Sequence, residues 1–376
     1  MSDEGNIEQN AITVSTRDAT EAGQRLAEWL GQQLPLGADP EVVSVTAPDA
    51  NGMSSETLLF DAVWTVEGER REHALVARVA PDVNDVPVFP SYDFETQFRV
   101  MRLVGEHGTD VPVPAVLWLE LDEGPIGSPF FVMERVVGRV PPDNMPYPMG
   151  SWLLDADAAD QRALQDATVR VVAGIHGIDV DRVDAAFLEL DAPGDTPLRR
   201  HVANQRLYYD WMRSGADYPV IEEAFAWLDA NWPDDEGDTV ISWGDSRVGN
   251  VMYDGFEPVA VLDWEMAALG TRGIDLGWMV FIHDFFQDIC RVMEMPGMPD
   301  FMRSGDVAAV YAEVTGLPEP DLEFYEVYAA LRHAIVMARV NQRAVHFGEA
   351  EPPATPDEAV MHRDLLRLMM AGRHQR

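Results

Sequence analysis

Three side chains within one short stretch of the sequence have the types and spacing to do chemistry together. Residues 241–264 read ISWGDSRVGNVMYDGFEPVAVLDW, in which Asn250 follows Asp245 with four residues between them. The residues after Asn250 read as two short strands joined by an Asp-Gly turn pair, and Asp263 closes the second strand. A loop followed by a hairpin would therefore bring Asp245, Asn250 and Asp263 close together.

Transfer of a phosphoryl group from ATP uses this combination of side chains. One carboxylate accepts or orients the proton of the attacking hydroxyl, while an amide oxygen and a second carboxylate hold the magnesium ions that bridge the phosphates. The Asp-x4-Asn spacing is that of a kinase catalytic loop, and an aspartate closing the next hairpin is the metal ligand. The alternative is structural, with Asp245 and Asn250 capping turns and Asp263 ending a strand. The hairpin with its terminal aspartate favours the chemical interpretation.

The composition is that of a strongly acidic globular protein. The chain has 376 residues, 47% of them hydrophobic, and a net charge of −38. This length favours two domains or lobes. Phosphate contacts need clustered cations, so the charge argues against nucleic acids and anionic membranes as partners. The acidity would attract a cationic substrate, with an ordinary solvated surface as the alternative. All 27 basic residues are arginine, so no lysine can take part in the chemistry.

The sequence favours a cytoplasmic enzyme. The first residues, MSDEGNIEQN, are polar and acidic, unlike a signal peptide, and no apolar run has the length of a membrane span. The single Cys290 excludes an internal disulfide and a cysteine-rich zinc site.

The first third of the chain predicts strands with one or two helices, after a disordered stretch at residues 1–16. Helices are predicted over 18–34 and 92–107, and strands over 41–46, 57–66, 73–80, 115–121 and 129–133. The loop between the first two strands is small and polar and contains Gly52, Ser54 and Ser55. Its backbone amides could cover phosphates, and a plain hairpin is the alternative.

Two opposite charges in this part could form an ion pair. Arg78 lies near the end of the third predicted strand, and Glu95 lies at the edge of the apolar stripe of the following helix. A pair between them would hold a cation against the phosphates of a nucleotide. The alternative for Glu95 is a solvated helix position, which is the commoner one for glutamate.

The proline-rich segment 140–149 marks the predicted domain boundary. It separates an N-terminal lobe at 17–137 from a helical C-terminal lobe at 138–376. Helices of this second lobe are predicted over 157–178, 198–213, 219–232, 305–315, 321–347 and 356–372. Asp275 precedes an apolar run and could be a helix N-cap, and His176 is expected to be a structural histidine.

With these elements in order, the chain resembles the aminoglycoside phosphotransferase and choline-kinase-like family over roughly residues 40–345. It looks most similar to the branch whose members also occur joined to acyl-CoA dehydrogenases. The most specific part of the resemblance is WGDSRVGNVMY followed by AVLDWEMAALG. The N-terminal part supports it in the same order, with NGMSSET, ALVARVAP, the helix carrying Glu95, and PFFVMERVVG.

The resemblance implies an α+β, bilobal, protein-kinase-like fold, with a small antiparallel β lobe and a larger helical lobe. ATP would lie between the lobes, with GTP left open as the nucleotide. Asp245, in a catalytic loop at 243–250, would be the catalytic base. Asn250 and Asp263 would be the Mg²⁺ ligands.

The resemblance also implies the remaining nucleotide contacts. Gly52, Ser54 and Ser55 would cover the phosphates. The stretch from Glu134 to Val136 would be the hinge whose backbone binds the adenine edge. Asp275 would brace the catalytic loop.

Two positions depart from the family pattern. The family usually has histidine two residues before the catalytic aspartate, where this chain has Trp243, which can fill the same space. The phosphate-anchoring lysine of the third strand is replaced by Arg78. Arginine binds phosphate bidentately and stays charged, but its planar fork is larger and could shift the nucleotide.

The leading hypothesis is therefore an ATP- and Mg²⁺-dependent phosphotransferase that acts on a hydroxyl of a small molecule. The alternatives are a nucleotide-binding protein with weak or no catalysis, which the two departures motivate, and a scaffold that binds no nucleotide. The acceptor could be aminoglycoside-like or hydroxyacyl-CoA-like, with sugars, choline-like alcohols and macrolides also open. A CoA phosphate would need an arginine cluster, and Arg199, Arg200 and Arg206 come nearest to one, although a solvated helix face is their simpler interpretation. No feature of the sequence sets the oligomeric state.

Overall fold

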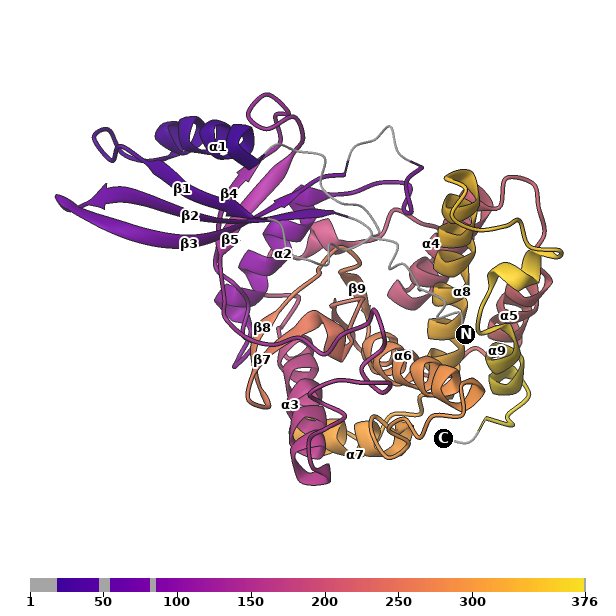
Figure 1. The fold of residues 1–376 in the computed structure, drawn as a ribbon. Coiled ribbons are helices and arrows are strands. Elements are labelled where there is room, and N and C mark those ends of the chain that lie inside the picture. Colours follow the sequence, from indigo (N-terminus) through magenta and orange to yellow (C-terminus); the bar gives the residue numbers. More distant parts are fainter. Residues whose placement is uncertain (1–18, 47–54, 82–85, 375–376) are drawn as a thin grey trace, which may run out of the picture. The chain divides into compact units, whose positions relative to one another are not determined.

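The chain divides into two compact units (Figure 1). In this computed structural model, the described residues are 19–46, 55–81 and 86–374, so the disorder expected at 1–16 concerns residues outside them. The first unit comprises residues 1–87 and 116–135, and the second comprises 88–115 and 136–376. The segment 88–115, which the sequence assigned to the N-terminal lobe, therefore groups with the second unit.

In its described residues, the first unit is a five-stranded antiparallel sheet with one helix packed on it. The strand order is β1-β2-β3-β5-β4. The elements are α1 (Ala19–Gln33), β1 (Glu41–Thr46), β2 (Glu56–Val66), β3 (Glu69–Val79), β4 (Val116–Glu120) and β5 (Phe130–Glu134). β2 and β3 form a long hairpin, and β5 pairs with β3 from the other side.

Alternation along β2 explains how this unit builds its core. Leu58, Phe60, Ala62 and Trp64 are buried, and the residues between them are partly exposed, as expected for a strand with one face on a core. Helix α1 covers that face (Figure 1), and its Trp29 packs edge-on against Phe130 with ring centroids 4.8 Å apart.

The second unit is mostly helical and carries two small two-stranded sheets. Its helices are α2 (Phe94–His107), α3 (Ala158–His176), α4 (Pro197–Met212), α5 (Pro219–Ala230), α6 (Arg272–Val292), α7 (Ser304–Thr315), α8 (Glu323–His346) and α9 (Arg363–Met370). Its strands are β6 (Thr239–Ser242), β7 (Val251–Asp254), β8 (Glu257–Val261) and β9 (Ala268–Thr271). β6 pairs with β9, and β7 pairs with β8.

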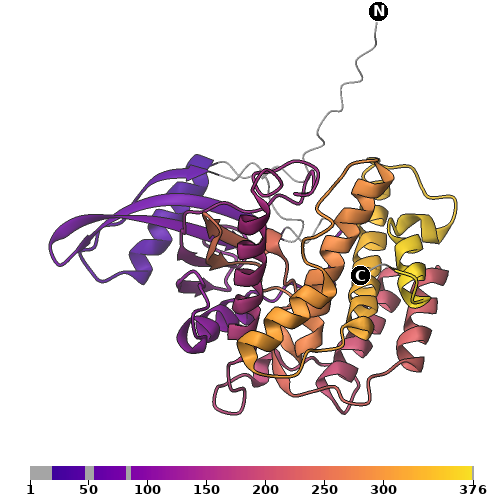
Figure 2. The same cartoon turned by 90° about the horizontal axis from the view of Figure 1, so that it is seen from below.

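The centre of the second unit is the pair of long helices α6 and α8, which pack along each other and appear in orange and gold in Figure 2. Their approach depends on glycine. A Cβ atom on Gly277 of α6 would lie 2.6 Å from the backbone of Tyr325 on α8, closer than van der Waals contact permits. These two helices supply several of the side chains around the candidate site.

The N-terminal antiparallel sheet followed by a mostly helical part confirms the predicted α+β class. One sequence-based expectation needs correction, and two strands were missed. The helix predicted over 356–372 is a 3₁₀ turn at Pro356–Ala359 followed by α9. At the break lies His362, the residue before α9, whose ring is buried and whose Nε2 binds the Ala330 carbonyl at 2.9 Å. Strands β6 and β9 were not predicted. In the described ranges, no helix is long and apolar enough to cross a membrane.

Candidate active site

Asp245 lies three residues after the end of β6, just past a turn that only glycine permits. Gly244 has φ of +92°, and a Cβ atom there would lie 2.1 Å from the carbonyl oxygen of Met266. β6 is held in place by β9, with Ser242 opposite Ala268. The strand pair and the glycine turn together fix where the carboxylate of Asp245 emerges.

The predicted pair of Asp245 and Asn250 is in direct contact. The side-chain amide of Asn250 donates to Oδ2 of Asp245 at 2.6 Å and to the backbone oxygen of Asp245 at 3.0 Å. Asn250 ends a short 3₁₀ turn that begins at Val248, and this turn folds the chain back toward Asp245. Because the NH₂ group is used in this way, the amide oxygen of Asn250 is the atom left to accept or coordinate.

Asp263 follows the hairpin of β7 and β8. Val251 pairs with Val261, and the backbone N–H of Leu262 donates to the carbonyl of Asn250 at 2.8 Å. Asp263 then adopts left-handed backbone geometry with φ of +59°, which is uncommon for a residue other than glycine. The hairpin thus brings the end of β8 back to Asn250, as the sequence predicted.

Trp243 ties these two segments together. Its fully buried indole donates from Nε1 to the carbonyls of Leu262 at 3.0 Å and Asp263 at 3.1 Å. A tryptophan at this position therefore connects the loop before Asp245 to the turn at Asp263.

Asp275 holds the loop that precedes Asp245 through hydrogen bonds. Its carboxylate accepts from the backbone N–H groups of Trp243 at 2.9 Å and Gly244 at 2.8 Å, and from the hydroxyl of Ser242 at 2.9 Å. The N-cap alternative for Asp275 is wrong, because the N-cap of α6 is Thr271 and Asp275 lies inside the first turn. The carboxylate instead points at the loop, which is the bracing position that the resemblance implied.

His176 is the fourth partner of this carboxylate. Its Nε2 lies 2.9 Å from Oδ2 of Asp275, and its Nδ1 lies 3.0 Å from the hydroxyl of Tyr311. Burial raises the pKa of Asp275, but the hydrogen bond and charge of His176, with the N–H groups of Gly244 and Trp243, outweigh burial and lower the pKa overall. His176 is thus structural, as expected.

Sequence reasoning missed a cation that holds Asp245. The Nε of Arg247 lies 3.0 Å from both carboxylate oxygens of Asp245, and its Nη1 pairs with Asp143. Gly249 makes room for this pair, since a Cβ atom there would lie 2.5 Å from the carboxylate oxygens of Asp143. Arg247 lies within the catalytic motif and could have been found there, whereas Asp143 lies in the proline-rich segment without any distinguishing signal.

Two further contacts to the Asp245 region come from distant helices. The indole Nε1 of Trp278 on α6 donates to Oδ1 of Asp245 at 2.6 Å. The guanidinium of Arg332 on α8 donates to the carbonyl of Gly244 at 3.1 Å. Nothing in the sequence around either residue indicated this role.

The electrostatics of the site favour proton exchange near neutral pH. Burial raises the pKa of Asp245 to about 7, and the negative charge of Asp263 adds to the rise, while the hydrogen bonds from Trp278 and Asn250 oppose it. Burial also lowers the pKa of Arg247, against the attraction of Asp263 and Glu265. A carboxyl group whose pKa lies near 7 can act as a general base at physiological pH.

The predicted nucleotide contacts of the first unit lie in its sheet. Ser55 is buried just before β2, and its Oγ has no hydrogen-bond partner within the described part of the chain. Arg78 is on β3 and donates from Nη1 to Oγ1 of Thr57 at 3.0 Å. Glu134 is the last residue of β5. Gly52 and Ser54 lie outside the described residues.

The remaining two predicted contacts belong to the second unit. Val136 is the first residue after the chain passes from the first unit to the second. Glu95 is exposed on α2 and lies 3.9 Å from Arg99, one turn further along. Arg78 and Glu95 belong to different units, so an ion pair between them stays a prediction.

The side chains around Asp245 suit a magnesium ion that shares its coordination with a ligand. In the described ranges, no group of three or more His, Cys, Asp or Glu residues is placed to hold a metal. Mg²⁺ is usually bound through one or two carboxylates plus water and substrate phosphates, not through an all-protein cage. The carboxylate of Asp263 and the amide oxygen of Asn250 are the hard oxygen donors that such a site needs.

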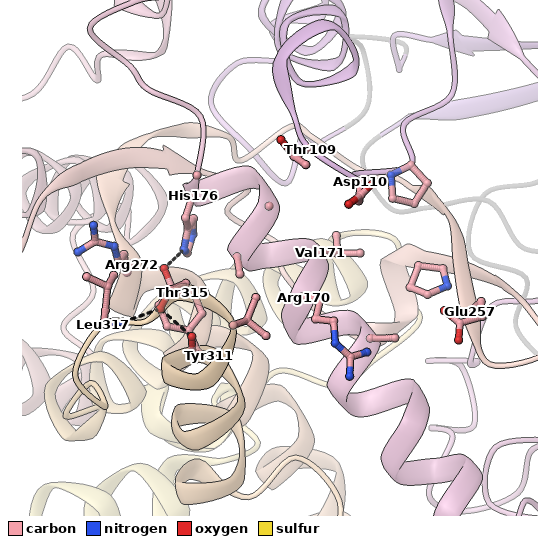
Figure 3. Close-up of a pocket in the computed structure, with 17 residues that line it drawn as sticks. Thr109, Asp110, Arg170, Val171, His176, Glu257, Arg272, Tyr311, Thr315 and Leu317 are labelled. Carbon is pink, nitrogen blue, oxygen red and sulfur yellow. Dashed lines mark hydrogen bonds between the residues drawn. The ribbon is translucent and has the colours of Figure 1, made fainter.

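A separate cavity of about 640 Å³ lies against α3 and α7 in the second unit (Figure 3). His176 and Tyr311 are joined by their hydrogen bond on its wall, and Arg170 and Glu257 also line it. Asp245, Asn250 and Asp263 do not line this cavity, so it is distinct from the candidate active site.

Comparison with known proteins identifies the family. Residues 55–294 match the sequence profile of the phosphotransferase enzyme family, which is more than half of the chain and includes Asp245, Asn250 and Asp263. The chain belongs to the phosphotransferase enzyme family. The resemblance found in the sequence motifs is thereby confirmed.

Curated relatives of this phosphotransferase-family chain carry acyl-CoA dehydrogenase names. It is 27% identical over 267 residues to "Probable acyl-CoA dehydrogenase IBR3" of Arabidopsis thaliana, covering 66% of this chain and 31% of that protein. It is also 27% identical over 254 residues to acyl-CoA dehydrogenase family member 11 of Homo sapiens, covering 67% of this chain and 30% of the human protein. The chain thus spans less than a third of the length of either relative.

Solved structures share the fold. A protein of Ralstonia eutropha with a provisional assignment as an aminoglycoside phosphotransferase matches with a TM-score of 0.63 and 24% identity, over 93% of this chain and 97% of that one. The aminoglycoside phosphotransferase APH(4)-Ia, in a ternary complex with AMP-PNP and hygromycin B, matches with a TM-score of 0.56 and 18% identity, over 94% and 100% of the two chains. At these identities the likeness concerns the fold.

Proposed function

We propose that this chain transfers the γ-phosphoryl group of ATP to a hydroxyl of a small molecule, with Mg²⁺ as cofactor. The observation that carries the proposal is the contact of Asp245 with Asn250, at the point where Trp243 fixes the turn of Asp263. A general base and two metal-binding oxygens are the side chains that this reaction requires.

In this proposal, Asp245 removes the proton of the acceptor hydroxyl. Its pKa of about 7 lets the carboxyl group give up its own proton at neutral pH and then accept one during the reaction. Asn250 and Asp263 would hold Mg²⁺, which, when bound, neutralises charge on the transferring phosphates. Arg247 lies beside Asp245 and keeps the carboxylate in a fixed orientation.

The nucleotide would be held by residues of both units. Gly52, Ser54 and Ser55 would cover the phosphates with backbone N–H groups, and the buried Ser55 hydroxyl is one further donor. Arg78, paired with Glu95, would bind a phosphate. The solved relative in complex with AMP-PNP supports nucleotide binding in general.

The backbone from Glu134 to Val136 would bind the adenine edge as the hinge. β5 ends at Glu134, and the backbone N–H of Arg135 still donates to Ala74 at 3.0 Å. The groups on either side of Arg135 are therefore the ones proposed to contact the base.

Two acceptor classes have support. The solved relative with hygromycin B supports an aminoglycoside-like acceptor, and the net charge of −38 would attract a polycation. The relatives named as acyl-CoA dehydrogenases support a hydroxyacyl-CoA acceptor.

The arginines that would serve a CoA phosphate are already paired with acids. Arg199 pairs with Asp195, Arg200 with Glu189 and Arg206 with Glu222. These pairs agree with the solvated-face interpretation of the three arginines, so a CoA phosphate bound there would have to compete with the acids.

The decisive test is ADP release from the purified protein with Mg-ATP against a panel of aminoglycosides, hydroxyacyl-CoAs and amino alcohols. We expect acceptor-dependent ADP release with at least one class, and its loss in Asp245→Asn. A rise in melting temperature with Mg-ATP but no product from any acceptor would favour nucleotide binding without catalysis. No thermal shift at all would contradict both proposals and favour a scaffold.

A further inference from the structure

The described part of the second unit holds a buried cation without an acidic partner. Arg332 on α8 is 2% exposed. Its Nη2 donates to the carbonyl of Gly244 at 3.1 Å, while Nε and Nη1 have no hydrogen-bond partner among the described residues. Most other described arginines are more exposed or paired with a carboxylate, as Arg247 is with Asp245 and Asp143. Arg332 therefore sits where an apolar residue would be expected.

This guanidinium lies over an aromatic ring that contacts Asp245. The central carbon of Arg332 lies 4.5 Å from the ring centroid of Trp278, a distance at which a cation is attracted to the face of an indole. Trp278 in turn donates its N–H to Oδ1 of Asp245 at 2.6 Å. Arg332 is therefore connected to Asp245 by two routes, through the backbone of Gly244 and through the ring of Trp278.

Packing alone does not account for an arginine at this position. Burying a guanidinium costs free energy unless its charge and its N–H groups are satisfied, and a well-packed apolar residue is often as stable or more so. Among the described residues, its guanidinium donates to a single oxygen, which belongs to the residue immediately before Asp245. The contacts of Arg332 thus converge on Asp245.

We propose that Arg332 and Trp278 are positioning residues that fix the carboxylate of Asp245 for proton removal from the acceptor hydroxyl. Arg332 fixes the backbone at Gly244 through a hydrogen bond and packs against the indole of Trp278. The indole in turn fixes Oδ1 of Asp245 through its N–H. This inference rests on the proposed phosphotransferase function.

The geometry explains why such a support is needed. Asn250 holds Oδ2 of Asp245 and Trp278 holds Oδ1, so the carboxylate cannot rotate. The Nε of Arg247 lies 3.0 Å from both oxygens, so an acceptor hydroxyl would have to take the place of this shared contact on one of them. Catalysis by a positioned base is sensitive to displacements of about 1 Å, which can cost about 10²-fold in rate.

The test compares Arg332→Met, Arg332→Lys and Trp278→Phe with two controls. Arg339→Met removes a guanidinium from the same helix, where it covers Trp211. Trp227→Phe removes an indole N–H that binds the carbonyl of Met370.

We expect kcat to fall about 10- to 100-fold in Arg332→Met and Trp278→Phe, with the KM for ATP within about twofold of the wild type. Arg332→Lys should recover part of the loss, because an ammonium can still donate to the Gly244 carbonyl. The two controls should retain kcat. A kcat within about twofold of the wild type in folded Arg332→Met and Trp278→Phe would overturn the positioning role.

A second readout needs no turnover. The indole N–H resonance of Trp278, assigned by its absence in Trp278→Phe, should shift in Arg332→Met and Arg332→Lys, and amide hydrogen exchange at residues 243–250 should speed up. Arg339→Met should leave both unchanged. If the Arg332 variants show these changes but the wild type shows no phosphotransfer, the proposed function fails while the structural coupling of Arg332 to the Asp245 loop stands. An unmoved resonance and unchanged exchange in Arg332→Met would overturn the inference even in an active enzyme.

Discussion

The indole nitrogen of Trp278 donates to Oδ1 of Asp245 over 2.6 Å, although the two residues are 33 positions apart in the chain. Arg247 contacts both oxygens of the same carboxylate, and Asn250 contacts Oδ2. The carboxylate of Asp245 is thus oriented by three donors from the protein itself. An orientation fixed in this way is the kind of preorganisation on which general base catalysis depends.

Asp245→Asn tests the role of the base. We expect turnover to fall by about 10²-fold or more, because an amide cannot take up the hydroxyl proton. Binding of Mg-ATP, measured as a rise in melting temperature, should persist. Asp254→Asn, on the exposed turn of the β7–β8 hairpin, is the control. A fully active Asp245→Asn protein would remove the residue from the mechanism.

The pH dependence of kcat/KM should show a single ionisation near pH 7. The pKa of Asp245 is raised to about 7, so the carboxyl group is protonated and inactive as a base below this pH, and activity rises as pH increases through it. Part of the rise in pKa comes from the charge of Asp263, which a bound cation would offset. Profiles at low and saturating Mg²⁺ should therefore differ, with the lower midpoint at saturating Mg²⁺. If the midpoint of the pH profile is the same at low and saturating Mg²⁺, this would argue against metal binding at Asp263.

Asp275→Asn should destabilise the fold and slow turnover together. The carboxylate accepts from four donors, and an amide would turn an NH₂ group toward some of them. We expect a loss of about 3 kcal/mol in the free energy of unfolding, measured by urea titration. Asp254→Asn again provides the comparison. Retained stability would mean that the loop does not depend on this carboxylate.

Two glycines with left-handed backbone allow a matched test of the turn before Asp245. Gly244→Ala places a Cβ atom 2.1 Å from a carbonyl oxygen, whereas the space around Gly255, with φ of +61°, is open. We expect Gly244→Ala to lower the free energy of unfolding by about 3 kcal/mol or more. Gly255→Ala should lower it by about 1 kcal/mol, from its backbone conformation alone. Thermal unfolding of both variants checks the difference. Equal losses would contradict the close contact at Gly244.

Buried histidines should make the fold sensitive to mild acid. Burial lowers the pKa of His362 to about 4 and that of His201 to about 3, so the folded protein keeps both rings neutral. The unfolded chain binds these protons near pH 6.5, so stability falls as pH drops below that value.

The contribution of one ring can be measured separately. Between pH 7 and pH 5, His362 should account for a loss of about 2 kcal/mol in the free energy of unfolding. Urea unfolding of His362→Gln at both values should show a correspondingly smaller drop than the wild type. The exposed His107→Gln is the control. An unchanged drop in His362→Gln would show that this ring does not carry the effect.

The sequence predicted those parts of the site that neighbouring residues determine. Asp245, Asn250 and Asp263 follow one another through a loop and a hairpin, so spacing and turn chemistry were enough to place them. The alternation of β2 and the apolar stripe of α2 likewise depend on residues within one element.

The contacts made across long stretches of chain could not be predicted in this way. Trp278 and Arg332 reach the loop of Asp245 only because α6 and α8 pack together. β6 and β9 are only four residues long each, and the β7–β8 hairpin separates them in the sequence. Strands this short show no recognisable hydrophobic pattern of their own. Asp143 comes to Arg247 from a segment whose composition indicated only a boundary.

The tryptophan that replaces the usual histidine before Asp245 has a consequence for how the enzyme responds to acidity. An imidazole in that place could gain or lose a proton, at a pH that its burial would set, whereas the indole of Trp243 is a donor at every pH. Its hydrogen bonds to the carbonyls of Leu262 and Asp263 therefore do not depend on pH. Protonation of Asp245 at low pH would therefore leave the hydrogen bonds between Trp243 and the turn at Asp263 in place.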